Sequence, residues 1–97
     1  MRHVKDKLID FAFRHESDQP QPVKDLIAST YAAASRLRKD CSDLAARRYR
    51  KGEHRYKTCW DMHISESQYY NLLSKFLMTA REIFGAELVA RANVEAT

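Results

Sequence analysis

Apolar side chains near the start of the chain recur at the three- and four-residue spacing of an amphipathic helix. The stripe consists of Val4, Leu8 and Phe11, and it is backed by Ile9, Ala12 and Phe13. We therefore expect a first helix over residues 2–14 that buries this stripe. Residues 15–22 are polar and contain both prolines of the chain, and proline disfavours helical geometry in the residue before it. This second segment is predicted to be a loop or hinge.

A further apolar pattern with the helical period starts at Val23 and predicts one long helix that begins just after Pro22. Its inward positions are expected to be Ile27, Tyr31, Ala34, Leu37, Cys41, Leu44 and Ala45. The helix should stop near Lys51, because Gly52 suits a C-terminal cap and the basic residues before it suit the negative end of the helix dipole. The alternative is a break near residues 40–42, with Ser42 and Asp43 capping a shorter helix.

A short third helix is expected over residues 54–62. Its candidate inward residues are Tyr56, Cys59, Trp60 and Met62. We expect Trp60 to pack between helices rather than stack on a base, because no second exposed aromatic lies beside it at nucleotide spacing.

Ser65 and Gln68 form a capping-box pattern that opens a fourth, longer helix after a tight turn at residues 62–65. Its apolar stripe is Tyr69, Leu72, Leu73, Phe76, Ala80, Ile83 and Phe84. Tyr69 is expected in the core, whereas Tyr70 lies about 100° further round the helix and should face outward. Gly85 is predicted to end or kink this helix near residue 84, and the tail after it to add a turn or two.

These patterns predict a single all-α domain, a small bundle of about four to five helices. At 97 residues the chain has room for one compact domain. Residues 1–22 would form an N-terminal helix and proline-containing loop, and residues 42–85 a helix-turn-helix region. No apolar run is long enough for a membrane span or a secretion signal, so we expect a cytoplasmic protein.

The net charge of +4 is concentrated in one segment. Residues 36–57 hold nine basic and three acidic residues, a formal charge of +6, which leaves −2 for the rest of the chain. A concentrated positive band attracts a polyanion through phosphate contacts and counterion release. The residues expected to bind DNA phosphates are Arg47, Arg48, Arg50, Lys51, Arg55 and Lys57. The alternative is a solvated helix face.

The order of a basic helix end, a short helix, a tight turn and a capped helix is typical of a helix-turn-helix, in which the second helix enters the major groove by its N-terminal end. Subtracting the buried stripe from the fourth helix leaves polar side chains on its first turns, with Ser74 beside them. Gln, Asn, Ser and Lys can all bond base edges. A solvent-facing helix commonly carries the same types, which is the structural alternative.

Residues 48–84 also resemble the C-terminal part of phage transcriptional activators of the ArpU and RinA type, which in turn resemble the promoter-binding helix-turn-helix of sigma factors. The residues in register are Arg48, Tyr49, Gly52, Met62, Ile64, Ser65, Glu66, Tyr69, Tyr70, Leu72 and Lys75. The resemblance implies a set of base-reading residues on the DNA-facing side. These are Ser65, Glu66, Ser67, Gln68, Tyr70, Asn71 and Lys75.

The chain departs from that pattern at three positions. Thr58 stands where the pattern has an aliphatic core residue, Glu53 where it often has an apolar one, and Asn71 where a basic side chain is usual. The last departure leaves Lys75 as the only positive charge on the expected reading surface.

The sequence disfavours an enzyme, since its histidines at positions 3, 15, 54 and 63 are scattered and it has only two glycines, without a phosphate loop. No cofactor is expected. The two cysteines form no CxxC element, and a zinc site of Cys41, His54, Cys59 and His63 is disfavoured because only the last two have a fixed spacing.

We therefore expect a sequence-specific regulator of phage or prophage transcription that binds double-stranded DNA, with RNA polymerase and a second copy as further possible partners. The rival is a protein-interaction or assembly module, such as a phage packaging subunit or helical adaptor, because the stripe over residues 23–45 also suits an oligomer seam.

Overall fold

The computed structural model describes residues 4–96, and the side chains of residues 7–86. In that part of the chain there are five α-helices, one 3-10 turn and no strand, which confirms the all-α class. The elements are α1 (Val4–Arg14), η1 (Glu16–Asp18), α2 (Gln21–Leu37), α3 (Lys39–Tyr49), α4 (Arg55–Met62) and α5 (Glu66–Ala96). No described helix is both long and apolar enough to cross a bilayer.

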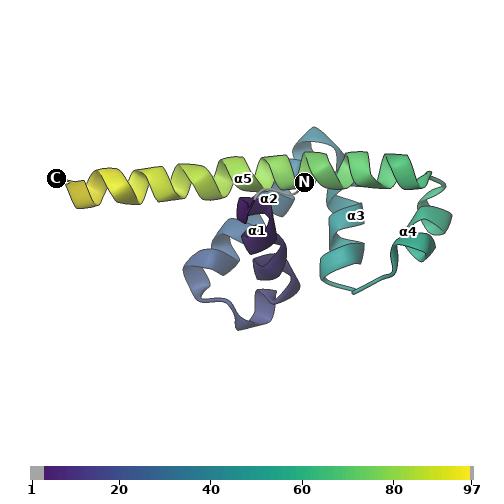
Figure 1. Ribbon diagram of the computed structural model, residues 1–97, viewed down its shortest axis with the longest axis horizontal. Coiled ribbons are helices and arrows are strands. Elements are labelled where there is room, and N and C mark those ends of the chain that lie inside the picture. The colour runs from purple at the N-terminus through teal and green to yellow at the C-terminus, as the bar shows by residue number, and fades with distance from the viewer. Residues whose placement is uncertain (1–3, 97) are drawn as a thin grey trace.

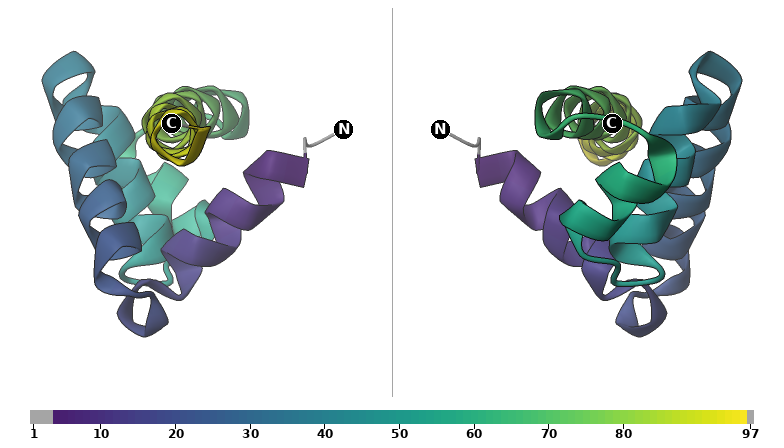
Figure 2. Two further views of the ribbon diagram at one scale, coloured as in Figure 1. Left: turned by 90° about the vertical axis from the view of Figure 1, so that its left-hand side faces the viewer. Right: turned by 90° about the vertical axis from the view of Figure 1, so that its right-hand side faces the viewer.

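The helix α5 runs the length of the molecule, and its C-terminal half projects beyond the other helices (Figure 1). Viewed along α5, α1 and α2 diverge from the loop that contains η1, and α5 lies across their open side (Figure 2). The helices α3 and α4 lie under the N-terminal half of α5, and a tight turn joins α4 to it (Figure 1). The first turns of α5 therefore lie at the opposite end of the molecule from the projecting half.

The core is centred on Phe13, whose side chain is 1% exposed. Its ring centroid lies 5.7 Å from that of Tyr31, 5.5 Å from Tyr49 and 5.4 Å from Phe76. These four rings come from α1, α2, α3 and α5. Because aromatic pairs at such distances contribute beyond their buried area, this cluster joins four helices into one unit.

The inward face of α1 differs from the expected one. Ile9, Ala12 and Phe13 are buried, but Leu8 and Phe11 are exposed, so their placement in the core was wrong. The side chain of Val4 lies outside the described residues. The helix carries two apolar stripes, and the core receives the one that contains Phe13.

Two helices, α2 and α3, replace the single helix predicted after Pro22. The first of them begins slightly earlier than predicted, at Gln21. The break lies at Arg38, with extended backbone at φ −154° and ψ 111°. It lies two residues before the break near residues 40–42 that the alternative expected, so the single helix was wrong. Ser42 is buried within α3 rather than capping it, so the expected capping residues were also wrong. Asp40 accepts two hydrogen bonds from the Arg38 guanidinium, at 3.0 and 2.7 Å, which hold the bend. Leu37, expected inside, is exposed beside it.

The C-terminal cap of α3 is close to the prediction. The helix ends at Tyr49, and Gly52 adopts the left-handed conformation, with φ +62°. The backbone N–H of Glu53 then donates to the Arg47 carbonyl at 2.8 Å, so the chain turns sharply toward α4. Glycine adopts a positive φ without the steric cost that a side chain brings.

The short helix α4 has the predicted bounds within one residue, but its inward face was assigned incorrectly. Trp60 is 82% exposed and Tyr56 is also exposed, so the prediction that Trp60 packs between helices was wrong. The fully buried side chain is Thr58, while Cys59 and Met62 are half-buried. The hydroxyl of this polar interior residue donates to Glu53.

The helix α5 begins as predicted and continues further than predicted. The Ser65 N–H donates to Gln68 Oε1 at 2.8 Å and the Gln68 N–H to Ser65 Oγ at 3.1 Å, which is the expected capping box. Gly85 neither ends nor kinks the helix, which runs on to Ala96 (Figure 1). A single glycine costs a helix only about 1 kcal/mol relative to alanine, which good helix formers on both sides offset.

Candidate nucleic-acid interface

The first turns of α5 present polar side chains to solvent. Tyr69 is buried, as predicted, and Tyr70 is exposed. Every predicted base-reading side chain is on the exposed surface, and the structure brings them together at one end of one helix. They are Ser65, Glu66, Ser67, Gln68, Tyr70, Asn71 and Lys75. Ser65 and Gln68 each use a side-chain oxygen in the capping box. The polar groups of Asn71 and Lys75 are therefore more accessible than theirs.

The connection between α4 and α5 is fixed by a left-handed residue. His63 has φ +55° and ψ +46°, the only positive φ of a non-glycine residue in the described part. The N–H of Ile64 donates to the Cys59 carbonyl at 3.0 Å, which closes the end of α4. The chain therefore reverses within three residues, so α5 starts directly beside α4 and its first turns are not covered.

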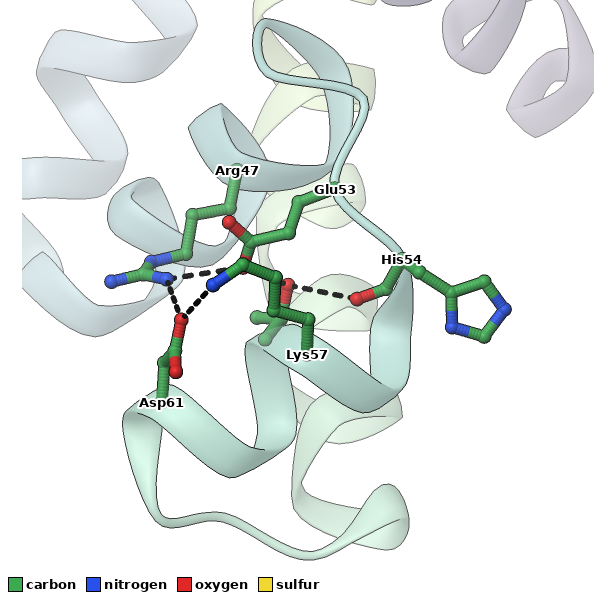
Figure 3. Close-up of polar contacts among 6 residues, drawn as sticks. Arg47, Glu53, His54, Lys57 and Asp61 are labelled. Atoms are coloured by element: carbon green, nitrogen blue, oxygen red, sulfur yellow. Dashed lines mark hydrogen bonds and ion pairs between the residues drawn. The ribbon is translucent and has the colours of Figure 1, made fainter.

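A polar cluster fixes α4 to α3 (Figure 3). Oε1 of Glu53 accepts a hydrogen bond from Arg47 Nη1 at 3.0 Å and another from the buried hydroxyl of Thr58 at 2.8 Å. Oδ2 of Asp61 accepts from Arg47 at 3.3 Å and from Lys57 at 2.8 Å. Burial pushes the pKa of Glu53 up, but the bonds from Thr58 and Arg47 outweigh it and lower that pKa. The cluster therefore depends on an ionised Glu53.

Two residues that depart from the phage-activator pattern are thus hydrogen-bond partners. Thr58 in place of an aliphatic residue and Glu53 in place of an apolar one form a hydrogen bond across the start of α4. A buried hydroxyl without a partner costs free energy, and this bond removes that cost.

A second polar network joins α1, α3 and α5. Arg48 donates to the buried Tyr69 hydroxyl at 3.2 Å, and its Nη2 lies 3.7 Å from Oδ1 of Asp10. The same carboxylate accepts from Tyr49 at 2.7 Å and from Arg14 at 2.7 Å. Burial raises the pKa of Asp10, but hydrogen bonds from Arg14 and Tyr49 more than offset it, so its pKa is lowered. Arg48, predicted to bind phosphate, is half-buried and engaged inside the molecule.

Other cations predicted to bind phosphate also have acidic neighbours. Arg50 pairs with Glu16 at 3.2 Å and lies 4.0 Å from the ring centroid of Tyr31, while Arg55 pairs with Glu66 at 2.7 Å. Exposed pairs of this kind contribute about 0–1 kcal/mol each, so a DNA phosphate can replace the carboxylate.

Two exposed lysines differ from these arginines in having no acidic partner among the described side chains. Lys51 and Lys75 form no ion pair with any residue whose side chain the structure describes. Their positive charge is therefore fully available to an anion.

The candidate zinc ligands are not brought together. The described residues contain no group of three or more His, Cys, Asp or Glu side chains placed to hold a metal ion. Cys41 is buried in α3, and burial raises the pKa of its thiol. His54 instead caps α4, with Nδ1 accepting from the Tyr56 N–H at 3.2 Å.

The sequence pattern gave no role to Asp10 or Arg14. It marked Thr58 only as a departure and His63 only as a disfavoured zinc ligand. A hydrophobic-period pattern gives no signal for a buried carboxylate or a left-handed histidine. No glycine stands between residues 62 and 65, and this absence is the one sign in the sequence that another residue takes the positive φ there.

Comparison with known proteins adds no relative. No family model, no curated protein and no solved structure matches this chain.

Proposed function

We propose that this protein binds double-stranded DNA and regulates transcription, with α4 and α5 acting as a helix-turn-helix. In this motif the second helix lies in the major groove and its N-terminal residues contact base edges. The observation that carries the proposal is the exposed, capped start of α5, held beside α4 by a three-residue turn and lined with hydrogen-bonding side chains.

Two groups of residues would divide the work. Asn71 and Lys75 lie on the same side of α5, four residues apart, and offer donors and an amide to base edges. Lys51 and Arg55, before and at the start of α4, would bind phosphates on the flanking backbone. This division moves Arg47 and Arg48 from phosphate binding to holding α4 and α5 in place, because both guanidinium groups already bind partners inside the molecule.

The proposal is supported by charge as well as by shape. The +6 segment of residues 36–57 contributes the end of α3, the loop and the start of α4, which all lie under the first half of α5 (Figure 1). Acidic residues from outside the segment pair with several of these cations, so the charge open to a polyanion is that of Lys51 together with exposed arginines whose carboxylate partners a phosphate can replace.

A duplex titration tests the proposal. Fluorescence anisotropy of a labelled duplex, selected from a random pool, is measured at about 50 and 200 mM salt, and affinity should fall about tenfold or more between them. Asn71→Ala should weaken the selected site and leave random duplex unchanged. Asn71 is preferred to Gln68 for this experiment because truncating Gln68 also removes one of the two hydrogen bonds of the capping box.

The matched charge variants complete the design. Lys51→Gln should weaken selected and random duplex alike, whereas Lys24→Gln, which removes the same charge at the start of α2, should change neither. The absence of salt-sensitive binding to any duplex in the pool would refute the proposal.

An assembly or adaptor role is the second candidate, and exposed apolar side chains favour it. Leu8 and Phe11 on α1, with Leu37 and Met78 on α2 and α5, are all exposed. Rising salt separates the two: association through these apolar side chains, followed by light scattering, should persist, whereas duplex binding should weaken.

A further inference from the structure

A basic hollow lies beside the exposed start of α5. It has a volume of about 350 Å³, and three arginines line it, Arg14 from α1, Arg48 from α3 and Arg55 from α4. Gly52, His54 and Tyr70 complete most of the wall. The hollow thus brings together cations from three helices, of which the sequence pattern indicated Arg48 and Arg55 but not Arg14.

Only one acidic residue, Glu53, is among the residues that line the hollow. Its Oε1 already accepts from Arg47 and Thr58, so its charge is directed into the polar cluster on α3 and α4. The imidazole of His54 points away from that cluster (Figure 3), and its Nδ1 is the acceptor for the Tyr56 N–H. The other ring nitrogen of His54 is therefore the donor.

Arg48 is engaged with Tyr69 and Asp10 and shapes the wall, whereas Arg14 and Arg55 are held in place without using all their donors. Nε of Arg14 donates to Asp10 at 2.7 Å, and Nε of Arg55 lies 2.7 Å from Glu66. A guanidinium has five N–H groups, so each of these side chains keeps several for another acceptor. Arginine groups fixed in this way match the geometry of phosphate oxygens.

We propose that this hollow binds one phosphate of the DNA backbone. The inference rests on the proposed function, and it adds Arg14, a residue of the N-terminal helix, to the contact surface. Tyr70 belongs both to the hollow and to the exposed side of α5, so a phosphate bound here flanks the groove that α5 enters. The volume is sufficient for a phosphate group with several waters, since a water occupies about 30 Å³.

The test uses the slope of log affinity against log salt, measured with the labelled duplex. Arg14→Gln should lower affinity about threefold to tenfold and reduce the slope by about 0.9, the value of one phosphate contact. Lys24→Gln is the control, because Lys24 borders a neighbouring hollow that contains no residue of α4 or α5. Arg55→Gln should give the same loss as Arg14→Gln, which covers the case that Arg14→Gln folds poorly after losing Asp10.

The outcomes distinguish the inference from the function on which it rests. If the wild-type protein binds duplex and the Arg14 and Arg55 variants keep its slope, the hollow is not a phosphate site and DNA binding stands. If no duplex binds, the proposed function is refuted, and binding of inorganic phosphate then tests the hollow by itself. Phosphate should then raise the melting temperature of the wild type and the Lys24 variant more than that of the Arg14 variant, and an equal rise in all three overturns the site.

Discussion

The hydroxyl of Tyr49 donates a 2.7 Å hydrogen bond to Oδ1 of Asp10, a residue 39 positions earlier in the chain. Through Arg48 and the buried Tyr69, the same network reaches α5. The N-terminal helix is thereby linked to the helix that carries the proposed reading residues. It completes the core and, in our proposal, contributes a phosphate ligand.

Tyr49→Phe is expected to lower the free energy of unfolding by about 2 kcal/mol, because it removes a hydrogen bond to a charged, mostly buried carboxylate. Chemical denaturation followed by circular dichroism measures this. The control is Tyr70→Phe, which removes a hydroxyl from an exposed ring and should cost less than about 0.5 kcal/mol. Equal losses in the two variants would show that the bond to Asp10 contributes nothing specific.

Acid should destabilise the protein through Asp10. Its folded-state pKa is lowered below that of the unfolded chain, so its contribution is present above the unfolded pKa of about 3.9 and is lost as pH falls through the folded pKa. Denaturation midpoints, measured from about pH 6 to 2, should drop as the pH falls below about 3.9. Asp10→Asn should be less stable near neutral pH and should show a shallower acid decline. A variant curve parallel to that of the wild type would assign the decline to other carboxylates.

The Thr58–Glu53 pair predicts non-additive substitutions. Thr58→Val and Glu53→Leu should each cost about 1–2 kcal/mol, because each removes the 2.8 Å bond and leaves Glu53 with Arg47 alone or the Thr58 hydroxyl with only the His54 carbonyl at 3.4 Å. The double variant, which places apolar side chains at both positions, should cost about 1 kcal/mol less than the sum. A double-mutant cycle by urea denaturation measures the coupling. Strict additivity would mean that the 2.8 Å contact between them is energetically neutral.

Gly85→Ala should stabilise the protein by about 0.5–1 kcal/mol, since alanine is the better helix former and an added Cβ meets nothing within 4 Å. Thermal denaturation detects the gain. Ala86→Gly, one residue further along the same helix, should lose a similar amount. A loss on Gly85→Ala would instead indicate that this glycine is required for contact with something outside the chain.

His63→Gly should also raise stability, by up to about 1 kcal/mol, because the left-handed backbone at this position is costly for any residue with a Cβ. His63→Ala is the matched control, since it removes the imidazole and keeps the Cβ. The two variants should differ in melting temperature, with the glycine variant higher. If they melt together, the imidazole and not the backbone determines the effect of substitution.

The sequence by itself determined the all-α class, the glycine cap at Gly52, the capping box at Ser65 and Gln68, and the burial of Tyr69 beside an exposed Tyr70. These follow from local rules: hydrophobic period, backbone preference of glycine and hydrogen bonding within one turn. A reader of the sequence therefore obtains the start of α5 and its polar face without coordinates.

Only the tertiary structure decided which of two apolar stripes α1 buries, where the helix after Pro22 breaks and that Trp60 faces solvent. It also decided that Arg47 and Arg48 bind partners inside the molecule, while Arg14 joins Arg55 at the basic hollow. The physical reason is that each of these outcomes depends on groups brought together from distant positions, as Asp10 and Tyr49 are. The period of a single helix gives an apolar face its direction, but the neighbouring helices determine which face is covered and which charge finds a partner.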